Sequence, residues 1–546
     1  MSPTKCKAMP DRPAASWIER YRTIEAHSFA ETLPALLQRA ARVHTNRYAL
    51  NFFESGTSIT FAELHQRVRR LAHGFDQLGV RHGDHVAVLC SNRIEYPLVW
   101  LALAELGAVM VPIVLKSTAR EIEYFLSDAD VKFLVVEEHL LEERGLISGQ
   151  GALPPAERIV TIGADHGVTA SFDALISRGD SQFRAPRPPA RGDLLNIQYT
   201  SGTTGLPKGT MLSHRYWIVL GGLMPLVYAD VFGRMLSDSP FYYMDAQWMV
   251  VAALSTGYCV DVAEKMSIRK WVDRLYSCRT EVAWFVEQSL KLPPDPREKD
   301  CRIKLFLGEH CSREALFAAA DRFGAPVREA YGSTEAGFVL SVPLEVPDPD
   351  ILGTCGVEGP FRKCRIVLED GSDAPPGVPG ELWVTGDGMF DGYYKRPDAN
   401  AEVLVDGWFR SGDLFVRDAK GFHRIIGRLK DMVRRSGENI ASSEVEHVLL
   451  QMPQITQAAV VAVPDPHRGE EVKAYVQLAP ETDRLSISTI LAHCAARLAP
   501  FKIPRYIAFV KDLPYTGSGK VAKRELVRNV PDLRVGAYDV VDHVQR

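Results

Sequence analysis

The sequence lacks any pattern of closely paired cysteines. Its nine cysteines are scattered over 546 residues, and no two of them form a Cys-x-x-Cys arrangement. Zinc sites and thioredoxin-like redox sites need such spacing, so neither is indicated. Scattered single cysteines are typical of a reducing compartment, and we expect the chain to be cytoplasmic.

No uninterrupted hydrophobic run predicts a transmembrane helix. The longest apolar stretch, residues 96–115, is broken by Glu105 and Pro112, whereas a membrane-spanning helix needs about 20 largely apolar residues. The first residues also lack the apolar core of a signal peptide. We therefore expect no membrane span, and we predict a buried helix followed by a strand at residues 96–115.

An excess of basic residues is also missing. The chain has 64 Lys and Arg against 68 Asp and Glu, for a formal net charge of −4. Proteins that bind nucleic acids or membrane surfaces usually carry a basic excess, so no nucleic-acid partner is expected. The hydrophobic fraction of 46% and charged fraction of 24% are ordinary, which excludes a collagen-like or largely disordered chain.

Helix and strand patterns alternate through the first 190 residues. Thr60 and Glu63 have the spacing of a capping box, and apolar residues follow at helical intervals until Gly79. A short apolar run at residues 86–89 predicts a buried strand. This alternation predicts an α/β protein whose large N-terminal domain is built from layered α/β subdomains.

The later part of the chain changes character. Short strand-like runs separated by turn residues predict a β-rich subdomain at about residues 353–426. A compact mixture of helices and strands follows, with a capping-box spacing at Ser443 and Glu446. We therefore predict an N-terminal domain of residues 1–429 and a small α+β C-terminal domain of residues 430–546.

The segment YTSGTTGLPKG at residues 199–209 has the composition of a phosphate-binding loop. Its glycines allow a close approach of the backbone, its Ser and Thr hydroxyls lie beside backbone amides, and Lys208 adds a positive charge. It is not a Walker A loop, because it does not fit G-x-x-x-x-G-K-[ST]. A flexible surface turn is the alternative interpretation.

This segment resembles the signature loop of the adenylate-forming superfamily, which contains acyl-CoA synthetases, peptide-synthetase adenylation domains and luciferases. Five further motifs of the superfamily are matched in its order, at residues 331–335, 380–394, 408–413, 427–439 and 516–520. The chain is identified as a member of this superfamily. Among the acyl-CoA synthetases it looks most like the carnitine/crotonobetaine-CoA ligase branch.

The resemblance implies an ATP-dependent carboxylic acid–CoA ligase. Such an enzyme joins a carboxylate and ATP into acyl-AMP and pyrophosphate, and then joins acyl-AMP and CoA into acyl-CoA and AMP. ATP, Mg²⁺, CoA and a small carboxylic acid are the expected ligands, and a homodimer is left open. Two alternatives are an acyl-AMP ligase that loads a carrier-protein pantetheine and a degenerate, non-catalytic nucleotide-binding protein.

The resemblance also assigns roles to single residues. Lys520 is the expected cation between the carboxylate and the α-phosphate, since both reactants are anionic. Glu335 is the expected Mg²⁺ ligand, and Thr204 and Lys208 complete the catalytic set. The expected nucleotide-binding residues are Thr200, Ser201, Gly202, Thr203, Thr204, Gly205, Lys208, Gly308, Glu309, Tyr331, Gly332, Thr334, Asp413 and Arg428.

Two further sets complete the expected site. Lys430 is the expected hinge of a mobile C-terminal domain, which presents Lys520 in one orientation and the following loop to the thiol in the other. Tyr243 departs from the histidine that many members carry, and the acid is not identified. The expected acyl-pocket residues are Tyr243, Met244, Gln247, Trp248 and Phe338, and the expected CoA and hinge residues are Lys430, Arg435, Ser436, Gly437, Glu438 and Asn439.

Overall fold

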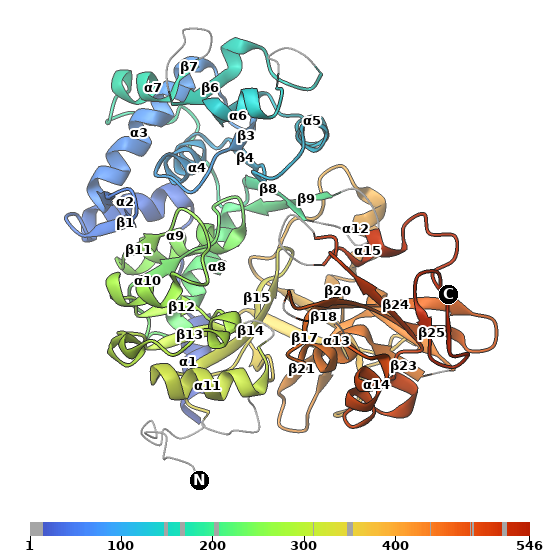
Figure 1. Cartoon of the computed structure of the whole chain (residues 1–546). Helices are drawn as coiled ribbons and strands as arrows, with labels where there is room; N and C mark the ends of the chain where they lie inside the picture. Colours follow the sequence, from blue (N-terminus) through green and yellow to red (C-terminus); the bar gives the residue numbers. More distant parts are fainter. Residues whose placement is uncertain are drawn as a thin grey trace. The chain divides into compact units, whose positions relative to one another are not determined.

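The computed structural model forms two compact units (Figure 1). The described residues of the larger unit come from Met1–Thr200, Pro207–Cys364 and Val384–Phe409, and those of the smaller unit from Arg365–Trp383 and Arg410–Arg546. The structure describes residues 15–146, 151–163, 170–200, 207–308, 311–346, 353–436, 438–480, 482, 485–515 and 521–546. The predicted boundary between residues 429 and 430 marks a hinge about which the C-terminal domain would rotate, and it stays a prediction.

Two mostly parallel sheets form the framework of the larger unit. The first has the strand order β7-β6-β5-β3-β4-β8-β9, and its pairs are parallel up to β8, which pairs antiparallel with β9. Its strands are β3 (His85–Leu89), β4 (Val109–Pro112), β5 (Phe133–Glu137), β6 (Ile159–Ile162), β7 (Ala170–Ser171), β8 (Leu194–Thr200) and β9 (Lys208–Ser213).

The second sheet has the order β16-β15-β14-β13-β12-β10-β11-β1-β2. It is parallel from β14 to β1 and antiparallel at both ends. Its strands are β1 (Tyr48–Phe52), β2 (Thr57–Thr60), β10 (Met235–Ser237), β11 (Val260–Val262), β12 (Val282–Trp284), β13 (Leu305–Gly308), β14 (Val327–Ser333), β15 (Gly337–Ser341) and β16 (Val357–Glu358).

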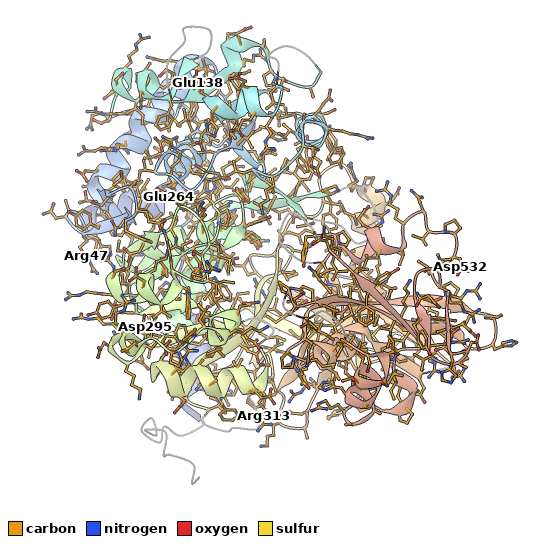
Figure 2. The ribbon with its side chains drawn as sticks, viewed as in Figure 1. Arg47, Glu138, Glu264, Asp295, Arg313 and Asp532 are labelled. Atoms are coloured by element: carbon orange, nitrogen blue, oxygen red, sulfur yellow. The ribbon has the colours of Figure 1, made fainter. Side chains whose placement is uncertain are left out.

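Helices cover these sheets, so that every residue of β4, β5 and β13 is buried, as parallel strands require. Charged side chains such as Glu264 and Arg313 remain exposed at the surface (Figure 2). The helices are α1 (Ala15–Glu25), α2 (Leu33–Val43), α3 (Phe61–Leu78), α4 (Glu95–Leu106), α5 (Ala119–Asp128), α6 (Glu138–Glu143), α7 (Phe172–Arg178), α8 (His214–Val227), α9 (Met244–Thr256), α10 (Trp271–Ser277), α11 (Arg313–Phe323) and α12 (Pro397–Val403).

Local signals define several of these elements as predicted. Thr60 and Glu63 form a reciprocal capping box before α3, and Gly79 ends that helix with a φ of +99°. Residues 96–115 contain the buried helix α4 followed by strand β4. In the described part of the chain, none of the helices combines the length and apolarity that crossing a bilayer requires.

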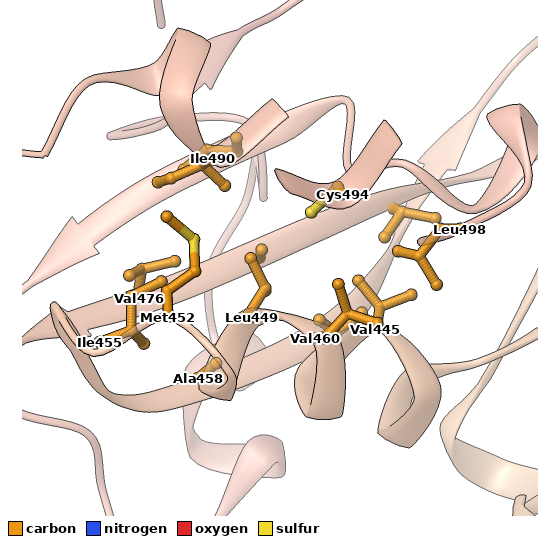
Figure 3. Packing of buried hydrophobic residues seen from close by; sticks show 14 of the residues in the cluster. Val445, Leu449, Met452, Ile455, Ala458, Val460, Val476, Ile490, Cys494 and Leu498 are labelled. Atoms are coloured by element: carbon orange, nitrogen blue, oxygen red, sulfur yellow. The ribbon is translucent and has the colours of Figure 1, made fainter. Parts of the chain in front are cut away.

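The smaller unit contains a sheet of order β23-β22-β25-β26-β27-β28, with β24 also paired to β25. Helices α13 (Ser442–Leu450) and α14 (Ile487–Ala495) contribute to its apolar core with residues such as Val445, Leu449 and Ile490 (Figure 3). The strands are β22 (Met432–Arg435), β23 (Glu438–Ala441), β24 (Ile455–Asp465), β25 (Gly469–Leu478), β26 (Tyr506–Val510), β27 (Tyr538–Asp539) and β28 (Val544–Gln545), and a short helix α15 (Lys523–Val527) precedes β27.

A further sheet accounts for the predicted β-rich subdomain, and the boundary between the two units passes through it. Its order is β17-β18-β20-β19, with β21 paired to β20. The strands are β17 (Arg362–Val367), β18 (Gly380–Gly386), β19 (Leu404–Val405), β20 (Trp408–Arg417) and β21 (His423–Arg428). Together these elements confirm the predicted multidomain α/β class.

The predicted capping box at Ser443 and Glu446 is wrong. The Ser443 hydroxyl donates to the carbonyl oxygen of Ile426 at 2.9 Å, and Glu446 accepts from the amide of Val460 at 2.6 Å. Both side chains have partners distant in sequence, which spacing within a helix cannot reveal.

Candidate active site

The carboxyl ends of β13 and β14 bring three predicted nucleotide-binding residues together. Gly308 ends β13 and pairs with Glu329 of β14, so Tyr331 and Gly332 follow just beyond it on the neighbouring strand. Tyr331 is 6% exposed. Ligands of parallel α/β sheets bind outside this edge, so the register agrees with a nucleotide site there.

A tight turn between β14 and β15 carries Thr334 and Glu335. The amide of Ala336 donates to the Ser333 hydroxyl at 3.1 Å across the turn. Gly332 must be glycine, because a Cβ there would lie 2.5 Å from the carbonyl oxygen of Gly337. Both predicted residues of the turn are half-buried.

The Glu335 carboxylate is held by Tyr393. The Tyr393 hydroxyl donates to Glu335 Oε1 at 2.8 Å, and the amide of Phe390 donates to the Glu335 carbonyl at 2.9 Å. A carboxylate offers about four acceptor positions on its two oxygens. One hydrogen bond therefore orients Glu335 while leaving acceptor capacity for a hard cation such as Mg²⁺.

Tyr393 also contacts Lys208. The Lys208 ammonium lies 4.8 Å from the centre of the Tyr393 ring, within the range of a cation–π interaction. The contact follows from backbone pairing, since Tyr394 donates its amide to Gly209 at 2.8 Å and Met211 donates to Gly392 at 2.9 Å.

Tyr393 was not among the predicted site residues, although the sequence motif that contains it was recognised. One tyrosine thus joins the predicted phosphate-binding lysine to the predicted metal ligand. Thr200 pairs with Lys208 at the end of the β8–β9 hairpin. The connecting residues lie outside the described part of the chain, so the predictions for Ser201, Gly202, Thr203, Thr204 and Gly205 cannot be placed.

Arg362 holds the turn that carries Glu335. Its guanidinium donates to the carbonyl oxygens of Ala336 at 3.0 Å and Gly388 at 3.3 Å, and also to that of Asp387. The residue is 4% exposed, and burial lowers the pKa of its guanidinium to about 10. Arg362 therefore ties the Glu335 turn to the loop that leads to Tyr393, a role that no sequence motif indicates.

Four of the five predicted acyl-pocket residues lie at the start of α9, and the fifth, Phe338, lies on β15. Tyr243 precedes the helix, its ring lies 4.8 Å from that of Tyr242, and burial raises the pKa of its hydroxyl. Gln198 of β8 donates to the Tyr242 carbonyl at 2.7 Å. The helix start is therefore fixed to the strand that leads into the predicted phosphate loop.

Met244 and Trp248 also lie in this region. Met244 Sδ accepts a weak hydrogen bond from the Tyr216 hydroxyl at 3.8 Å. The rings of Trp248 and Trp284 meet edge to face at 6.5 Å, and Phe338 on β15 is 5% exposed. These side chains are aromatic or apolar, as those of ligand pockets commonly are, and the acyl pocket stays a prediction.

Gln247 has a different setting from the other members of this set. It is fully buried, donates to the Phe241 carbonyl at 2.7 Å and accepts from the Asn196 amide at 3.0 Å. Its amide therefore fixes the segment before α9, so its part in an acyl pocket would be to hold Tyr243 and Met244 in place.

In the smaller unit, Asp413 and Arg428 are directly paired across β20 and β21. Arg428 Nε lies 3.1 Å from Asp413 Oδ1, the Asp413 side chain is 5% exposed and that of Arg428 is 52% exposed. The pair presents a mostly buried carboxylate next to a solvent-facing guanidinium. Such a carboxylate can accept from two vicinal hydroxyls.

Lys430 lies in the short turn Leu429–Asp431 between β21 and β22, and its role as a hinge stays a prediction. Arg435 ends β22, and Ser436 follows with a φ of +53° and donates its amide to the Arg468 carbonyl at 2.8 Å. Glu438 is exposed at the start of β23. The predictions for Gly437, Glu309, Lys520 and the side chain of Asn439 lie outside the described residues.

Arg435, predicted to serve CoA, has a partner within the unit. Its Nε lies 2.6 Å from Glu471 Oε2, and its side chain is 11% exposed. It also donates to the Phe501 carbonyl at 2.9 Å. In this conformation the Arg435 charge is offset internally.

Two protein-family descriptions match this chain. Residues 37–394 match the family described as AMP-binding enzyme, and residues 444–520 match the AMP-binding enzyme C-terminal domain. A feruloyl-CoA synthase of an Amycolatopsis species is 33% identical over 500 residues, which cover 90% of this chain and 97% of that protein. A crotonobetaine/carnitine–CoA ligase of Salmonella arizonae is 29% identical over 514 residues, which cover 89% and 97%.

A solved structure shares the fold at a similar level. ATP-bound MatB from Rhodopseudomonas palustris aligns with a TM-score of 0.78 and 27% identity, covering 90% of this chain and 98% of that chain. These similarities confirm the predicted superfamily and fold class. The two relatives at 33% and 29% identity are named for different acids.

Proposed function

Because the chain belongs to the family of AMP-binding enzymes, we propose that it is an ATP-dependent carboxylic acid–CoA ligase. It would form acyl-AMP and pyrophosphate from an acid and ATP, and then acyl-CoA and AMP. The observation that carries this proposal is the joint contact of Tyr393 with Lys208 and Glu335. A cation and a carboxylate held by one residue suit a phosphate group and its metal ion.

Lys208 would offset phosphate charge from the start of β9, and Glu335 would supply a carboxylate ligand to Mg²⁺. Magnesium typically takes one or two protein carboxylates and completes its shell with phosphate oxygens and water, which a single oriented glutamate fits. Bound there, the ion would stabilise the charge that develops on the phosphates. Lys520 would do the same between the acid and the α-phosphate.

Tyr331 would stack on the adenine, with Gly308 beside it, and Thr334 would contact the phosphates. Asp413 would accept from the ribose hydroxyls, and Arg428 would contact the ribose or phosphate. For Asp413 the support is its low exposure and its ion pair with Arg428, which keep the carboxylate oriented.

The acid would bind beside Tyr243, Met244 and Trp248, whose side chains are mostly aromatic or apolar. Ferulate and crotonobetaine are the first acids to test, because relatives are named for their CoA esters. After adenylation, rotation about Lys430 would bring the 435–439 loop to the thiol of CoA. Such an enzyme would work in the cytoplasm, and the eight described cysteines are all free thiols, as a reducing compartment predicts.

The test is pyrophosphate release with ATP and Mg²⁺ across short, medium and long fatty acids, aryl acids, steroid-derived acids and betaine-type acids. Each acid is assayed with and without CoA, and Glu335→Gln is the matched inactive control. Sustained release with one acid class and CoA supports the ligase. Sustained release without CoA would favour an acyl-AMP product and a carrier-protein acceptor. ATP binding without release for any acid would favour the non-catalytic alternative.

A further inference from the structure

The last residues of the chain extend the sheet of the smaller unit beyond the segment that matches the family C-terminal domain, which ends at residue 520. Strand β27 pairs antiparallel with β26, with Tyr506 opposite Asp539, and β28 pairs with β27. We call residues 528–546 the C-terminal tail. It is therefore an integral edge of this sheet.

Asp539 is the buried anchor of this tail. It has no exposed surface, and its carboxylate lies 3.2 Å from Arg505 Nε and 2.7 Å from a terminal nitrogen of Arg546. It also accepts from the amides of Val541 at 3.0 Å and Asp542 at 3.2 Å. Burial alone would raise the pKa of Asp539, but these hydrogen bonds hold it well below its usual range, so the carboxylate is charged.

Arg505 links Asp539 to acidic residues outside the tail. Besides Asp539, its guanidinium lies 3.3 Å from Asp465 and 3.7 Å from Glu471. Glu471 is itself fully buried and lies 2.6 Å from Arg435 and 3.4 Å from Arg468. A single buried carboxylate thus serves three arginines, and Asp539, Asp465 and Asp542 offset the one nearest the tail.

These ion pairs extend to the residues that follow strand β22. Arg435 is the last residue of that strand, and the next residue, Ser436, is bound through its amide to the Arg468 carbonyl at 2.8 Å. Both arginines that contact Glu471 on this side therefore hold the first turn of the 435–439 loop. A change in their pairing would move the loop directly.

We propose that the C-terminal tail positions the 435–439 loop for the thioester half-reaction, with Asp539 acting through Arg505 and Glu471 on Arg435. This rests on the proposed function, in which that loop meets the thiol. Without the Asp539 charge, Arg505 loses the nearest of its carboxylates and shifts toward Glu471, where it competes with Arg435, because a mostly buried guanidinium needs counter-charge. Arg435 then loses part of its ion pair, and the loop loses its fixed start.

The adenylation half-reaction has separate supports. The segment that carries Lys520 is followed by Lys523, whose ammonium lies 2.7 Å from Glu446 on α13. The amide of Ala522 donates to the Pro514 carbonyl at 2.7 Å across the same segment. Neither contact includes Asp539, Arg505, Glu471 or Arg435, so the two half-reactions should respond differently to a change at Asp539.

The experiment compares Asp539→Asn with Asp532→Asn in the full-length chain. Asp532 lies in the same tail (Figure 2), is 41% exposed and pairs with Arg534 at 2.9 Å. Both changes remove one carboxylate charge and keep the side-chain shape. Acyl-AMP formation and thioester formation from supplied acyl-AMP and CoA are measured separately, with the panel acid that wild type uses best.

We expect Asp539→Asn to slow the thioester step at least about tenfold, since small misplacements of catalytic elements cost one to two orders of magnitude. Acyl-AMP formation should stay within about twofold of wild type, and Asp532→Asn should change neither step. Arg546→Gln, at the exposed end of the tail, is a second control: it keeps the Asp539 carboxylate for Arg505, so it should leave the thioester step within about twofold of wild type. Equal loss of both half-reactions in a folded variant, or an unchanged thioester step, would overturn the proposal.

Hydrogen exchange separates this proposal from the proposed function. Backbone amides of residues 432–441 should exchange faster in Asp539→Asn than in wild type and Asp532→Asn, whatever the enzyme's substrate. Unchanged exchange there would refute the positioning role. Faster exchange combined with a wild type that forms no acyl-AMP from any acid would refute the ligase and retain the link between the tail and the loop.

Discussion

Removal of the Tyr393 hydroxyl should weaken metal-dependent adenylation. Tyr393→Phe deletes the 2.8 Å hydrogen bond to Glu335 Oε1 and keeps the ring below Lys208. A hydrogen bond to a charged group is worth about 1.5–3 kcal/mol, which corresponds to roughly ten- to a hundredfold in rate. Loss of residues that orient metal ligands typically costs a similar 10–100-fold factor.

Tyr393→Leu removes the ring as well. The Lys208 contact then disappears, and a cation–π interaction at an accessible site is worth about 0.5–1 kcal/mol. That corresponds to a further loss of about two- to fivefold. Comparison of the two variants therefore separates the effect of the hydrogen bond to Glu335 from the effect of the ring contact with Lys208.

The assay is pyrophosphate release as a function of Mg²⁺ concentration at saturating ATP and acid. For Tyr393→Phe we expect the Mg²⁺ concentration at half-maximal rate to rise, with partial recovery at high Mg²⁺. Tyr394→Phe is the matched control, because the Tyr394 hydroxyl donates to Asp130 at 2.8 Å, also a carboxylate, on the exposed side of the same segment. The reasoning fails if Tyr393→Phe keeps the wild-type Mg²⁺ dependence or if both variants lose activity equally.

Three further substitutions test other parts of the site. Lys520→Ala should abolish acyl-AMP formation and spare thioester formation from supplied acyl-AMP; loss of both steps would contradict the two-orientation mechanism. Arg362→Met should lower the melting temperature, because buried carbonyl groups left without a donor cost about 1–3 kcal/mol each. Thermal denaturation measures this, and an unchanged midpoint would refute the stabilising role of Arg362. Tyr243→His should alter the relative kcat/KM among acids more than the KM for ATP, and an unchanged acid profile would remove Tyr243 from the acyl pocket.

Much of the fold could be predicted from local patterns. The capping box at Thr60 and Glu63 and the buried helix and strand at residues 96–115 are set by neighbours in sequence, and the structure contains them. The motif order identified the superfamily, because each motif needs particular residue types in a short window. The Ser443 prediction failed for the complementary reason, since Ser443 lies on α13 and its hydroxyl donates to a carbonyl oxygen on strand β21.

The same distinction applies to the candidate site. Lys208 and Glu335 belong to short motifs, so the sequence indicated both, but it could not indicate that Tyr393 lies between them. That contact depends on the pairing of residues 391–394 with β9, which joins segments far apart along the chain. Arg362 belongs to no motif, and its role follows from its hydrogen bonds to the carbonyl oxygens of Ala336, Asp387 and Gly388, which lie far from it in sequence.

The sequence motif locates Arg435 correctly, but it does not show which group the Arg435 charge contacts. The motif places it beside the expected CoA loop, and a solvent-facing arginine there would suit the phosphates of CoA. The structure instead pairs it with the buried Glu471, and removing Glu471 would leave the mostly buried Arg435 without its counter-charge, which typically costs about 3–5 kcal/mol. Glu471 therefore offsets the charge of Arg435 in this conformation. Because Arg505 contacts Glu471 and also pairs with Asp539, we expect the C-terminal tail to affect the thioester step through these residues.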